Sequence, residues 1–116
     1  SESHVQRAIS IVEDFYGRDL TVQYIADKLN LNRSYLSEIF SKQMGVPLKK
    51  YILDFRITQS EEFLFTSDWS VDYISQICGF NSPSYFSKIF KEYHGISPTE
   101  YRKSRHKREH QTVLVK

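Results

Sequence analysis

Short hydroxyl and charged side chains recur at the same spacing in two segments of the chain. Residues three and four positions apart share one face of a helix, so each set would project from a single side. In chain order the sets are Arg33, Ser34, Ser37, Glu38 and Ser41, and Pro83, Ser84, Ser87, Lys88 and Lys91. Small hydroxyl groups allow close approach to a base edge or a phosphate, and cations pair with phosphates. The chemistry that these residue types favour is therefore recognition of nucleic acid.

The two sets belong to a longer internal repeat. Residues 34–42 read SYLSEIFSK, and residues 84–92 read SYFSKIFKE. Upstream, the repeat continues one residue out of phase in segments 21–26 and 70–75. A duplicated supersecondary unit gives one chain two copies of whatever the unit does.

Each copy carries the signals of a helix, a tight turn and a second helix. The matching pairs are Thr21 and Ser70 as caps of a short helix, Asn30 and Gly79 as left-handed turn residues, and Asn32 and Ser82 as caps of the second helix. Pro83 suits the first helical position, directly after the Ser82 cap. This order of caps and turn residues is typical of a helix-turn-helix, predicted at about 20–46 and again at about 70–95.

Apolar residues at helical spacing predict which sides of the second helices face the core. The predicted core residues are Leu36, Ile39, Phe40 and Met44 in the first copy, and Phe86, Ile89, Phe90 and Tyr93 in the second. Cys78 takes the place of Leu29 in the repeat, so we expect it to be a core residue rather than a nucleophile. Backbone N–H groups at the starts of these helices are expected to suit phosphate oxygens.

The whole pattern predicts an all-α fold of seven helices, with two helix-turn-helix subdomains joined by a long linking helix. The first helix is predicted at 5–16 and the linking helix at 48–66. Two apolar stripes on the linking helix indicate that it packs against both subdomains and fixes their separation. Segment 97–100, SPTE, is a capping box that opens a last short helix. We expect one domain over 1–105, followed by a basic flexible tail at 106–116.

Composition and charge limit the class of protein. A chain of 116 residues with 40% hydrophobic content suits a packed domain, and its one cysteine excludes an internal disulfide. We expect a cytoplasmic protein with no membrane span and no leader peptide. Residues 88–116 carry a net charge of +5 and residues 1–87 a net charge of −3. This asymmetry favours an anionic partner at the C-terminal end or, alternatively, a solubilising tail.

Several short motifs resemble the DNA-binding domain of AraC/XylS-type transcription regulators. They are ICGF at 77–80, SYFS at 84–87, FK at 90–91, GISPTEYR at 95–102, YLS at 35–37 with Phe40, and FRI at 55–57. The resemblance covers about residues 5–105 and is more specific in the second copy than in the first. It implies a seven-helix domain with two helix-turn-helix motifs and sequence-specific binding to double-stranded promoter DNA.

Functional residues can be assigned from this resemblance by position. Base contacts would come from Ser34, Ser37 and Glu38 in the first copy, and from Pro83, Ser84, Ser87 and Lys88 in the second. Phosphate contacts would come from Arg33, Tyr35 and Lys42, and from Ser82, Tyr85 and Lys91. The resemblance also implies that the chain is a fragment that lacks a separate effector or dimerisation domain, and that an activator would contact RNA polymerase. Because positive charge gathers around the second copy, we expect it to supply more phosphate-anchored affinity, and the first more discrimination.

Three of the charged residues also have a structural interpretation. Glu38 stands where relatives often carry a basic or amide side chain; it can accept from cytosine N4 or pair with Lys42. Lys88 can bind guanine or a phosphate, or pair with Glu92. Arg56 in the linking helix favours a structural role, bonded to carbonyls or to an acid.

Other functions have weaker support. His106 and His110, with Glu109 beside them, have the i, i+4 spacing of metal ligands but no third placed ligand, so we expect no metal and no cofactor. The chain carries neither a glycine-rich phosphate loop nor a nucleophile–base constellation, so no enzyme is expected. The alternative function is a helical protein-interaction module that no longer binds DNA, favoured by the modest net charge of +2. Salt dependence distinguishes the two, because phosphate-anchored binding weakens steeply with salt.

Overall fold

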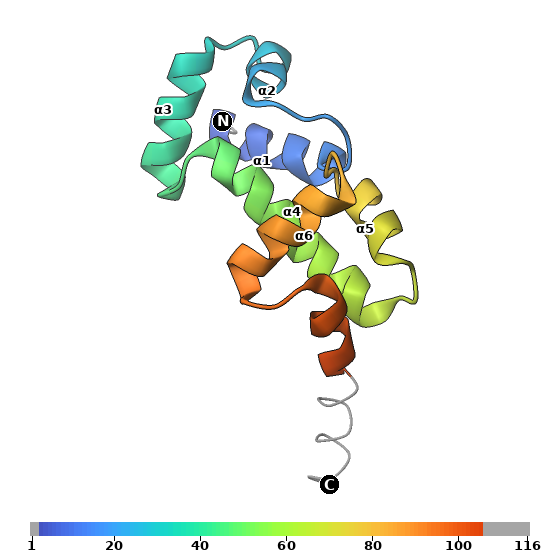
Figure 1. The fold of residues 1–116 in the computed structure, drawn as a ribbon. Helices are drawn as coiled ribbons and strands as arrows, with labels where there is room; N and C mark the ends of the chain where they lie inside the picture. The colour runs from blue at the N-terminus through green and yellow to red at the C-terminus, as the bar shows by residue number, and fades with distance from the viewer. Residues whose placement is uncertain (1–2, 106–116) are drawn as a thin grey trace, which may run out of the picture. The chain divides into compact units, whose positions relative to one another are not determined.

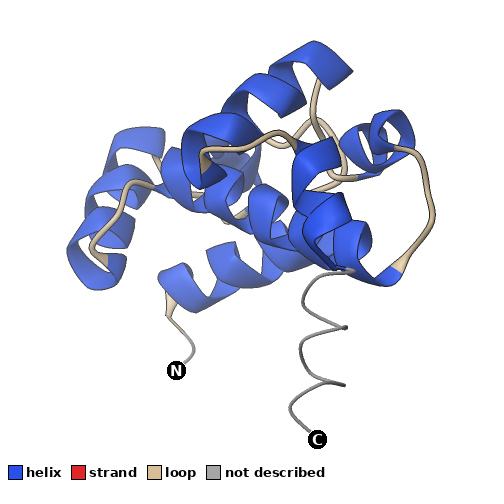
Figure 2. Ribbon diagram, turned by 60° about the horizontal axis from the view of Figure 1, so that its bottom comes forward, coloured by secondary structure: helices blue, strands red, loops and turns tan. Residues whose placement is uncertain are grey.

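The computed structural model describes residues 3–105, and every regular element in this part of the chain is an α-helix (Figure 2). Six helices, coloured along the chain in Figure 1, are α1 (His4–Phe15), α2 (Val22–Lys28), α3 (Arg33–Met44), α4 (Leu48–Thr66), α5 (Val71–Ile77) and α6 (Pro83–His94). A further helix covers 98–105, up to the last described residue. The predicted all-α fold of seven helices is confirmed. The predicted tail at 106–116 lies outside the described residues.

The chain divides into two compact units, Ser1–Thr58 and Gln59–Lys116. The boundary falls inside α4, so this helix contributes its N-terminal part to the first unit and its C-terminal part to the second. The first unit therefore contains α1, α2, α3 and the start of α4. The second contains the end of α4, α5, α6 and the helix at 98–105.

The first unit is held together by apolar side chains from all four of its helices. Its buried core consists of Val5, Ala8, Val12, Leu20, Ile25, Ala26, Leu36, Phe40, Leu48 and Ile52. Tyr51 of α4 packs edge-on against Phe40 of α3, with 5.3 Å between ring centroids. Burial of its ring, together with the negative charge of Glu13, raises the pKa of Tyr51 above its ordinary value.

The second unit repeats this arrangement with a more aromatic core. Its buried apolar residues include Leu64, Ile74, Cys78, Phe80, Phe86, Ile89 and Phe90. Tyr101 packs edge-on against Phe90 at 5.2 Å, which reproduces the Tyr51–Phe40 pair of the first unit. Cys78 is fully buried, which confirms its assignment as a core residue.

Caps and turn residues fix the ends of the short helices as the sequence predicts. Thr21 Oγ1 accepts the Tyr24 N–H at 3.0 Å, and Ser70 Oγ accepts the corresponding Tyr73 N–H at the same distance. After α2 and α5, Asn30 has φ 56° and Gly79 has φ 87°. Both values lie in the left-handed region that asparagine and glycine tolerate best, so the chain reverses between the two helices of each unit.

The predicted capping box opens the helix at 98–105. The Ser97 N–H donates to Glu100 Oε1 at 3.0 Å, and the Glu100 N–H donates to Ser97 Oγ at 3.1 Å. Hydrogen bonding to the backbone N–H and then to the side chain of Ser97 stabilises the ionised Glu100 carboxylate and holds its pKa below its ordinary value. The reciprocal bonds satisfy two N–H groups that the helix start would otherwise leave unpaired.

One core prediction was wrong by a single position. Tyr93, predicted to face inward, is 39% exposed, and its neighbour His94 faces inward instead. The His94 ring stacks on Phe90 at 4.3 Å, and its Nε2 lies 2.8 Å from Glu61 Oε2. Steps of three and four residues both stay near one face of a helix, so Tyr93 and His94 lie on either side of the line through Phe86 and Phe90, and it is the His94 ring that packs inward.

In both units, arginine side chains bind the segment that follows a helix: the one after α1 in the first unit and the one after α4 in the second. Arg56 donates from Nε to the Tyr16 carbonyl and from Nη2 to the Arg18 carbonyl, each at 3.0 Å. This confirms its predicted structural role. In the second unit, Arg105 donates to the Ser67 carbonyl at 2.9 Å, just past the end of α4. Carbonyl oxygens at a helix C-terminus carry partial negative charge and suit such cations.

Candidate nucleic-acid interface

The exposed side of α3 carries the first set of predicted base contacts. Asn32 caps this helix, and Arg33 occupies its first position. Ser34 and Glu38 are exposed, while Ser37 is half-buried. The opposite side of the helix packs into the core, so these three side chains share the face that remains accessible.

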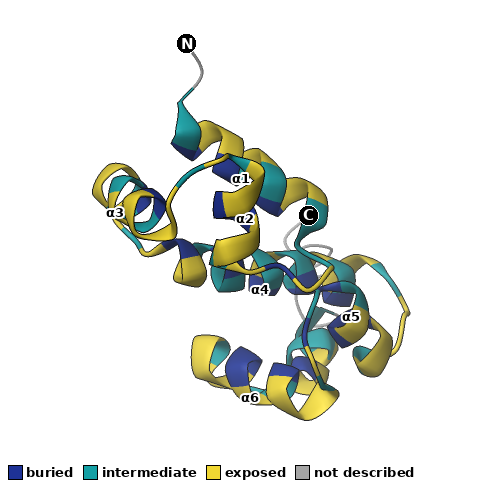
Figure 3. Cartoon of the chain, turned by 90° about the horizontal axis from the view of Figure 1, so that it is seen from above, coloured by how far each residue is buried: buried dark blue, intermediate teal, exposed yellow. Residues whose placement is uncertain are grey.

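The exposed side of α6 carries the second set. Pro83 is the first helical residue, and Pro83, Ser84 and Lys88 are all exposed. Ser87 is half-buried, like Ser37 at the matching position of α3. Figure 3 shows exposed and buried stretches alternating along both helices, as expected when only one side of each is accessible. The base-contact candidates thus gather on two helix faces, one in each unit.

Caps already occupy most of the backbone N–H groups at the starts of these helices. Asn32 Oδ1 accepts from the N–H groups of Ser34 at 2.8 Å and Tyr35 at 3.2 Å. In α6, Ser82 Oγ accepts the Tyr85 N–H at 3.1 Å, and Pro83 has no N–H to donate. The expectation that these amides suit phosphate oxygens is therefore wrong for Ser34, Tyr35 and Tyr85. The predicted phosphate contacts of Tyr35 and Tyr85 therefore depend on their side chains.

The predicted phosphate contacts are mostly accessible. Tyr35 is 48% exposed and Tyr85 is 43% exposed. The remaining cationic candidates, Arg33, Lys42 and Lys91, are exposed as well. Ser82 is half-buried and serves as the cap of α6, although its hydroxyl keeps a hydrogen to donate.

The ion pairs proposed as structural alternatives do not form. Within residues 3–105, Glu38 makes no ion pair with Lys42, and Lys88 makes none with Glu92. The ion pairs of this part of the chain lie elsewhere, for example between Lys50 and Asp54 at 3.0 Å. The charges of Glu38 and Lys88 therefore remain on the accessible faces of their helices.

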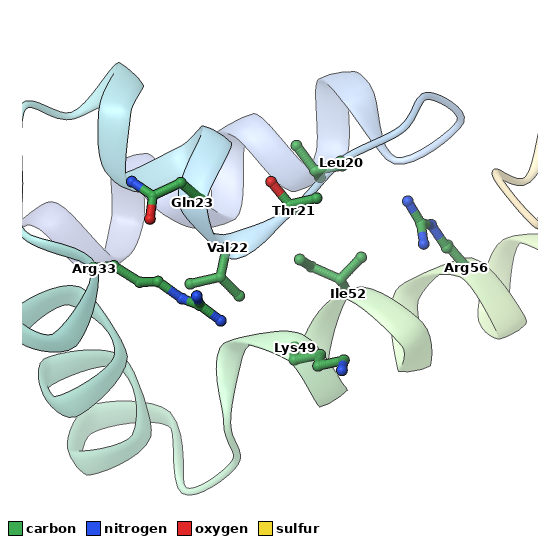
Figure 4. A pocket seen from close by; sticks show the side chains of 8 residues that line it. All are labelled: Leu20, Thr21, Val22, Gln23, Arg33, Lys49, Ile52 and Arg56. Atoms are coloured by element: carbon green, nitrogen blue, oxygen red, sulfur yellow. The ribbon is translucent and has the colours of Figure 1, made fainter.

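A cavity beside α3 brings together cations that the sequence did not associate. We call it the basic pocket; it encloses about 420 Å³ within the first unit and is lined by Leu20, Thr21, Val22, Gln23, Arg33, Lys49, Ile52 and Arg56 (Figure 4). Arg33 extends from the start of α3 toward the part of α4 that carries Lys49. Lys49 was missed as a candidate because it belongs to the linking helix. Comparison of the two copies could have identified it, because Lys49 is a cation at a position where the second copy carries the uncharged Thr99.

Among the residues that the structure describes, no group of three His, Cys, Asp or Glu side chains could hold a metal ion. The metal-ligand spacing of His106 and His110 falls outside those residues. No helix between residues 3 and 105 combines the length and the apolar composition needed to cross a bilayer.

Comparison with known proteins connects this geometry to a family. A family model described as a helix-turn-helix domain matches residues 25–104, more than half of the chain. The Msm operon regulatory protein of Streptococcus mutans is 41% identical over 103 residues, which cover 89% of this chain and 37% of that protein. The chain spans about a third of the length of the curated relatives it matches.

Two solved structures share the fold over most of the chain. The DNA-binding domain of AdpA, a global transcriptional factor in complex with a target DNA, has a TM-score of 0.87 and 26% identity, covering 96% of this chain and 99% of that one. A transcriptional regulator with an AraC-type DNA-binding domain, from Chromobacterium violaceum, has a TM-score of 0.80 and 27% identity. That match covers 88% of this chain and 91% of the other.

Proposed function

Because this chain belongs to the AraC-type helix-turn-helix family of transcription regulators, we propose that α3 and α6 enter successive major-groove segments of one promoter site. The chain is the DNA-binding domain of such a regulator. The second helix of a helix-turn-helix enters the major groove with its N-terminal residues against base edges, and successive segments on one side of the duplex are about 34 Å apart. The two units would then act together as one domain on an asymmetric site of about two turns.

The observation that carries this proposal is the exposed N-terminal half of the second helix in both units. The base-contact candidates are Ser34, Ser37 and Glu38 on α3, and Pro83, Ser84, Ser87 and Lys88 on α6. Their hydroxyl, carboxylate and ammonium groups can read base edges in the major groove. The phosphate-contact candidates are Arg33, Tyr35, Lys42, Ser82, Tyr85 and Lys91, which would position the helices without specifying sequence.

The remainder of the regulator is proposed from the length of the relatives. We infer that an effector or dimerisation domain accompanies this one, and that RNA polymerase is a partner if the regulator activates transcription. The work of the domain is binding rather than catalysis, in the cytoplasm where promoter DNA is accessible.

Binding to DNA at increasing salt tests this function. A site is first selected from random duplexes, and affinity for it is then measured by fluorescence anisotropy across a salt series. If about six phosphates are contacted, we expect log K to fall with log salt with a slope of about −5. We also expect a selected site without two-fold symmetry. A protein-interaction module would show no selected site and no steep salt dependence, which would refute the proposal.

A further inference from the structure

Three of the eight Lys and Arg residues of the first unit line the basic pocket, although residues 1–87 as a whole are net negative. Arg33, Lys49 and Arg56 line this pocket from the start of α3 and from two places on α4, and it contains no acidic side chain. Cations from separate elements that converge on one cavity mark it as a site for an anion.

The second unit does not repeat this pocket. At the matching positions of the repeat, Pro83 replaces Arg33, Thr99 replaces Lys49, and the acid Asp72 replaces Gln23. A cavity of the second unit is lined by residues that include Asp72 and Pro83. Because the framework of the two units is the same, Arg33 and Lys49 are a feature of the first unit and not a requirement of the fold.

The construction of the pocket favours a firmly placed anion. Arg56 is held by its bonds to the Tyr16 and Arg18 carbonyls, so its charge is fixed before any ligand arrives. Leu20 and Ile52 are buried and form an apolar part of the lining. Apolar surroundings exclude water and strengthen the attraction between a cation and an anion.

The place of the pocket within the helix-turn-helix identifies the anion. In this motif the first helix crosses the DNA backbone while the start of the second helix meets base edges. Thr21, Val22 and Gln23 line the pocket from the start of α2, and Arg33 lines it from the start of α3. The pocket therefore lies where the backbone passes next to the bases that Ser34 would reach.

We propose that the basic pocket holds a phosphate of the DNA backbone beside the bases read by α3, with Lys49 as an additional contact. This inference rests on the proposed function and refines it. Arg33 and Lys49 bind the phosphate, Arg56 adds fixed positive charge, and the apolar lining accommodates the neighbouring sugar. The first unit thus anchors the backbone as well as discriminating bases.

Two adjacent lysines provide a matched test. Lys49 lines the pocket, whereas Lys50 pairs with Asp54 on the exposed surface of α4. Lys49→Gln should reduce the steepness of the salt dependence by about one unit and weaken binding equally on selected and unrelated duplexes, because a phosphate contact carries no sequence information. Lys50→Gln should change the slope by much less.

A second variant and the wild-type protein separate the possible outcomes. Arg33→Gln should reproduce the effect of Lys49→Gln, and the double variant should lose about two units of slope. If Lys49→Gln leaves the slope unchanged, or if both lysine variants lower it equally, the pocket is not a phosphate site; an acidic protein segment would then be its better occupant. If the wild-type chain itself selects no DNA site, the proposed function fails, and not this inference alone.

Discussion

Glu38 and Lys88 occupy matching positions on α3 and α6 but carry opposite charges. Both side chains are exposed, and neither forms the intrahelical pair that its sequence neighbours would allow within the described residues. A carboxylate near phosphates is repelled by them, so an exposed Glu38 weakens binding to any DNA unless a base offers a donor. Cytosine N4 is such a donor in the major groove. Glu38 is thus a candidate for discrimination, and Lys88 for affinity.

Removing the Glu38 carboxylate should separate these two effects. Glu38→Ala should lower the preference at one base pair by about 1–3 kcal/mol, because it removes a direct base contact. It should also raise affinity for unrelated duplexes, because a charge repelled by phosphates is gone. Site selection and anisotropy measure the two quantities. Gln43→Ala, on an exposed residue near the end of α3, should change neither. Unchanged preference at every base pair in Glu38→Ala would remove Glu38 from the base-reading set.

At the scale of the helices, arginines bind the segment that follows α1 in the first unit and the segment that follows α4 in the second. Arg56 bonds the carbonyls of Tyr16 and Arg18, and Arg105 bonds the Ser67 carbonyl. Arg102 joins the second site, and burial, together with the nearby charge of Arg105, lowers its pKa below the ordinary arginine value. These bonds place the loops that lead into α2 and α5, and therefore the starts of both helix-turn-helix motifs.

Loss of the Arg56 side chain should destabilise the first unit. Arg56→Ala should lower the free energy of unfolding by about 1.5 kcal/mol, the lower end for hydrogen bonds from a charged donor because the site is partly exposed. Arg56→Lys should recover only part of this loss, since an ammonium cannot reproduce the planar fork of a guanidinium. Urea unfolding followed by circular dichroism measures both.

The exposed pair of Lys50 and Asp54 supplies the comparison for that experiment. Lys50→Ala should cost less than about 0.5 kcal/mol, as is usual for an i, i+4 pair on the surface. Equal losses for Arg56→Ala and Lys50→Ala would show that the two carbonyl bonds add nothing beyond a surface charge.

What could be predicted from the sequence is what depends on near neighbours. Caps such as Thr21 and turn residues such as Asn30 act on backbone groups a few positions away, so residue type and spacing are sufficient to identify them. The bonds of Arg105 join residues 37 to 41 positions apart, and no local pattern reveals them. The same holds for Lys49, whose part in the basic pocket depends on how α4 passes α2 and α3. Near the end of α6, His94 faces the core and the predicted Tyr93 does not, which shows that a periodic pattern can be misread by one residue near a helix end.

At the scale of the whole molecule, counts of charge misrepresent how the two units differ. The C-terminal excess of positive charge suggested that the second unit anchors the phosphates. Arg102 and Arg105 in that region, however, donate to backbone carbonyls of their own unit. The first unit, in a net negative part of the chain, carries the basic pocket. Part of the C-terminal charge therefore maintains the fold, and both units have side chains available for the DNA backbone.

The boundary between the two units falls inside α4. We therefore expect this helix to set the phase, meaning the rotational offset, between α3 and α6, the second helices of the two helix-turn-helix motifs. Ile57 precedes the boundary between Thr58 and Gln59 and Ser60 follows it, and both side chains are buried. An α-helix turns by about 100° and rises about 1.5 Å per residue. One alanine inserted after Thr58 should therefore rotate one recognition helix relative to the other by about 100° while leaving the residues of each core unchanged.

Such an insertion should leave the free energy of unfolding close to that of the wild type. It should reduce affinity for the complete two-segment site to that for a half-site, because only one unit can then engage its segment. Anisotropy titrations on complete and half-site duplexes measure this difference. Thr58→Ala changes the same exposed position without shifting the phase and should bind the complete site as the wild type does. If the insertion variant also binds the complete site with wild-type affinity, α4 does not govern the phase, and each unit must reach its segment independently.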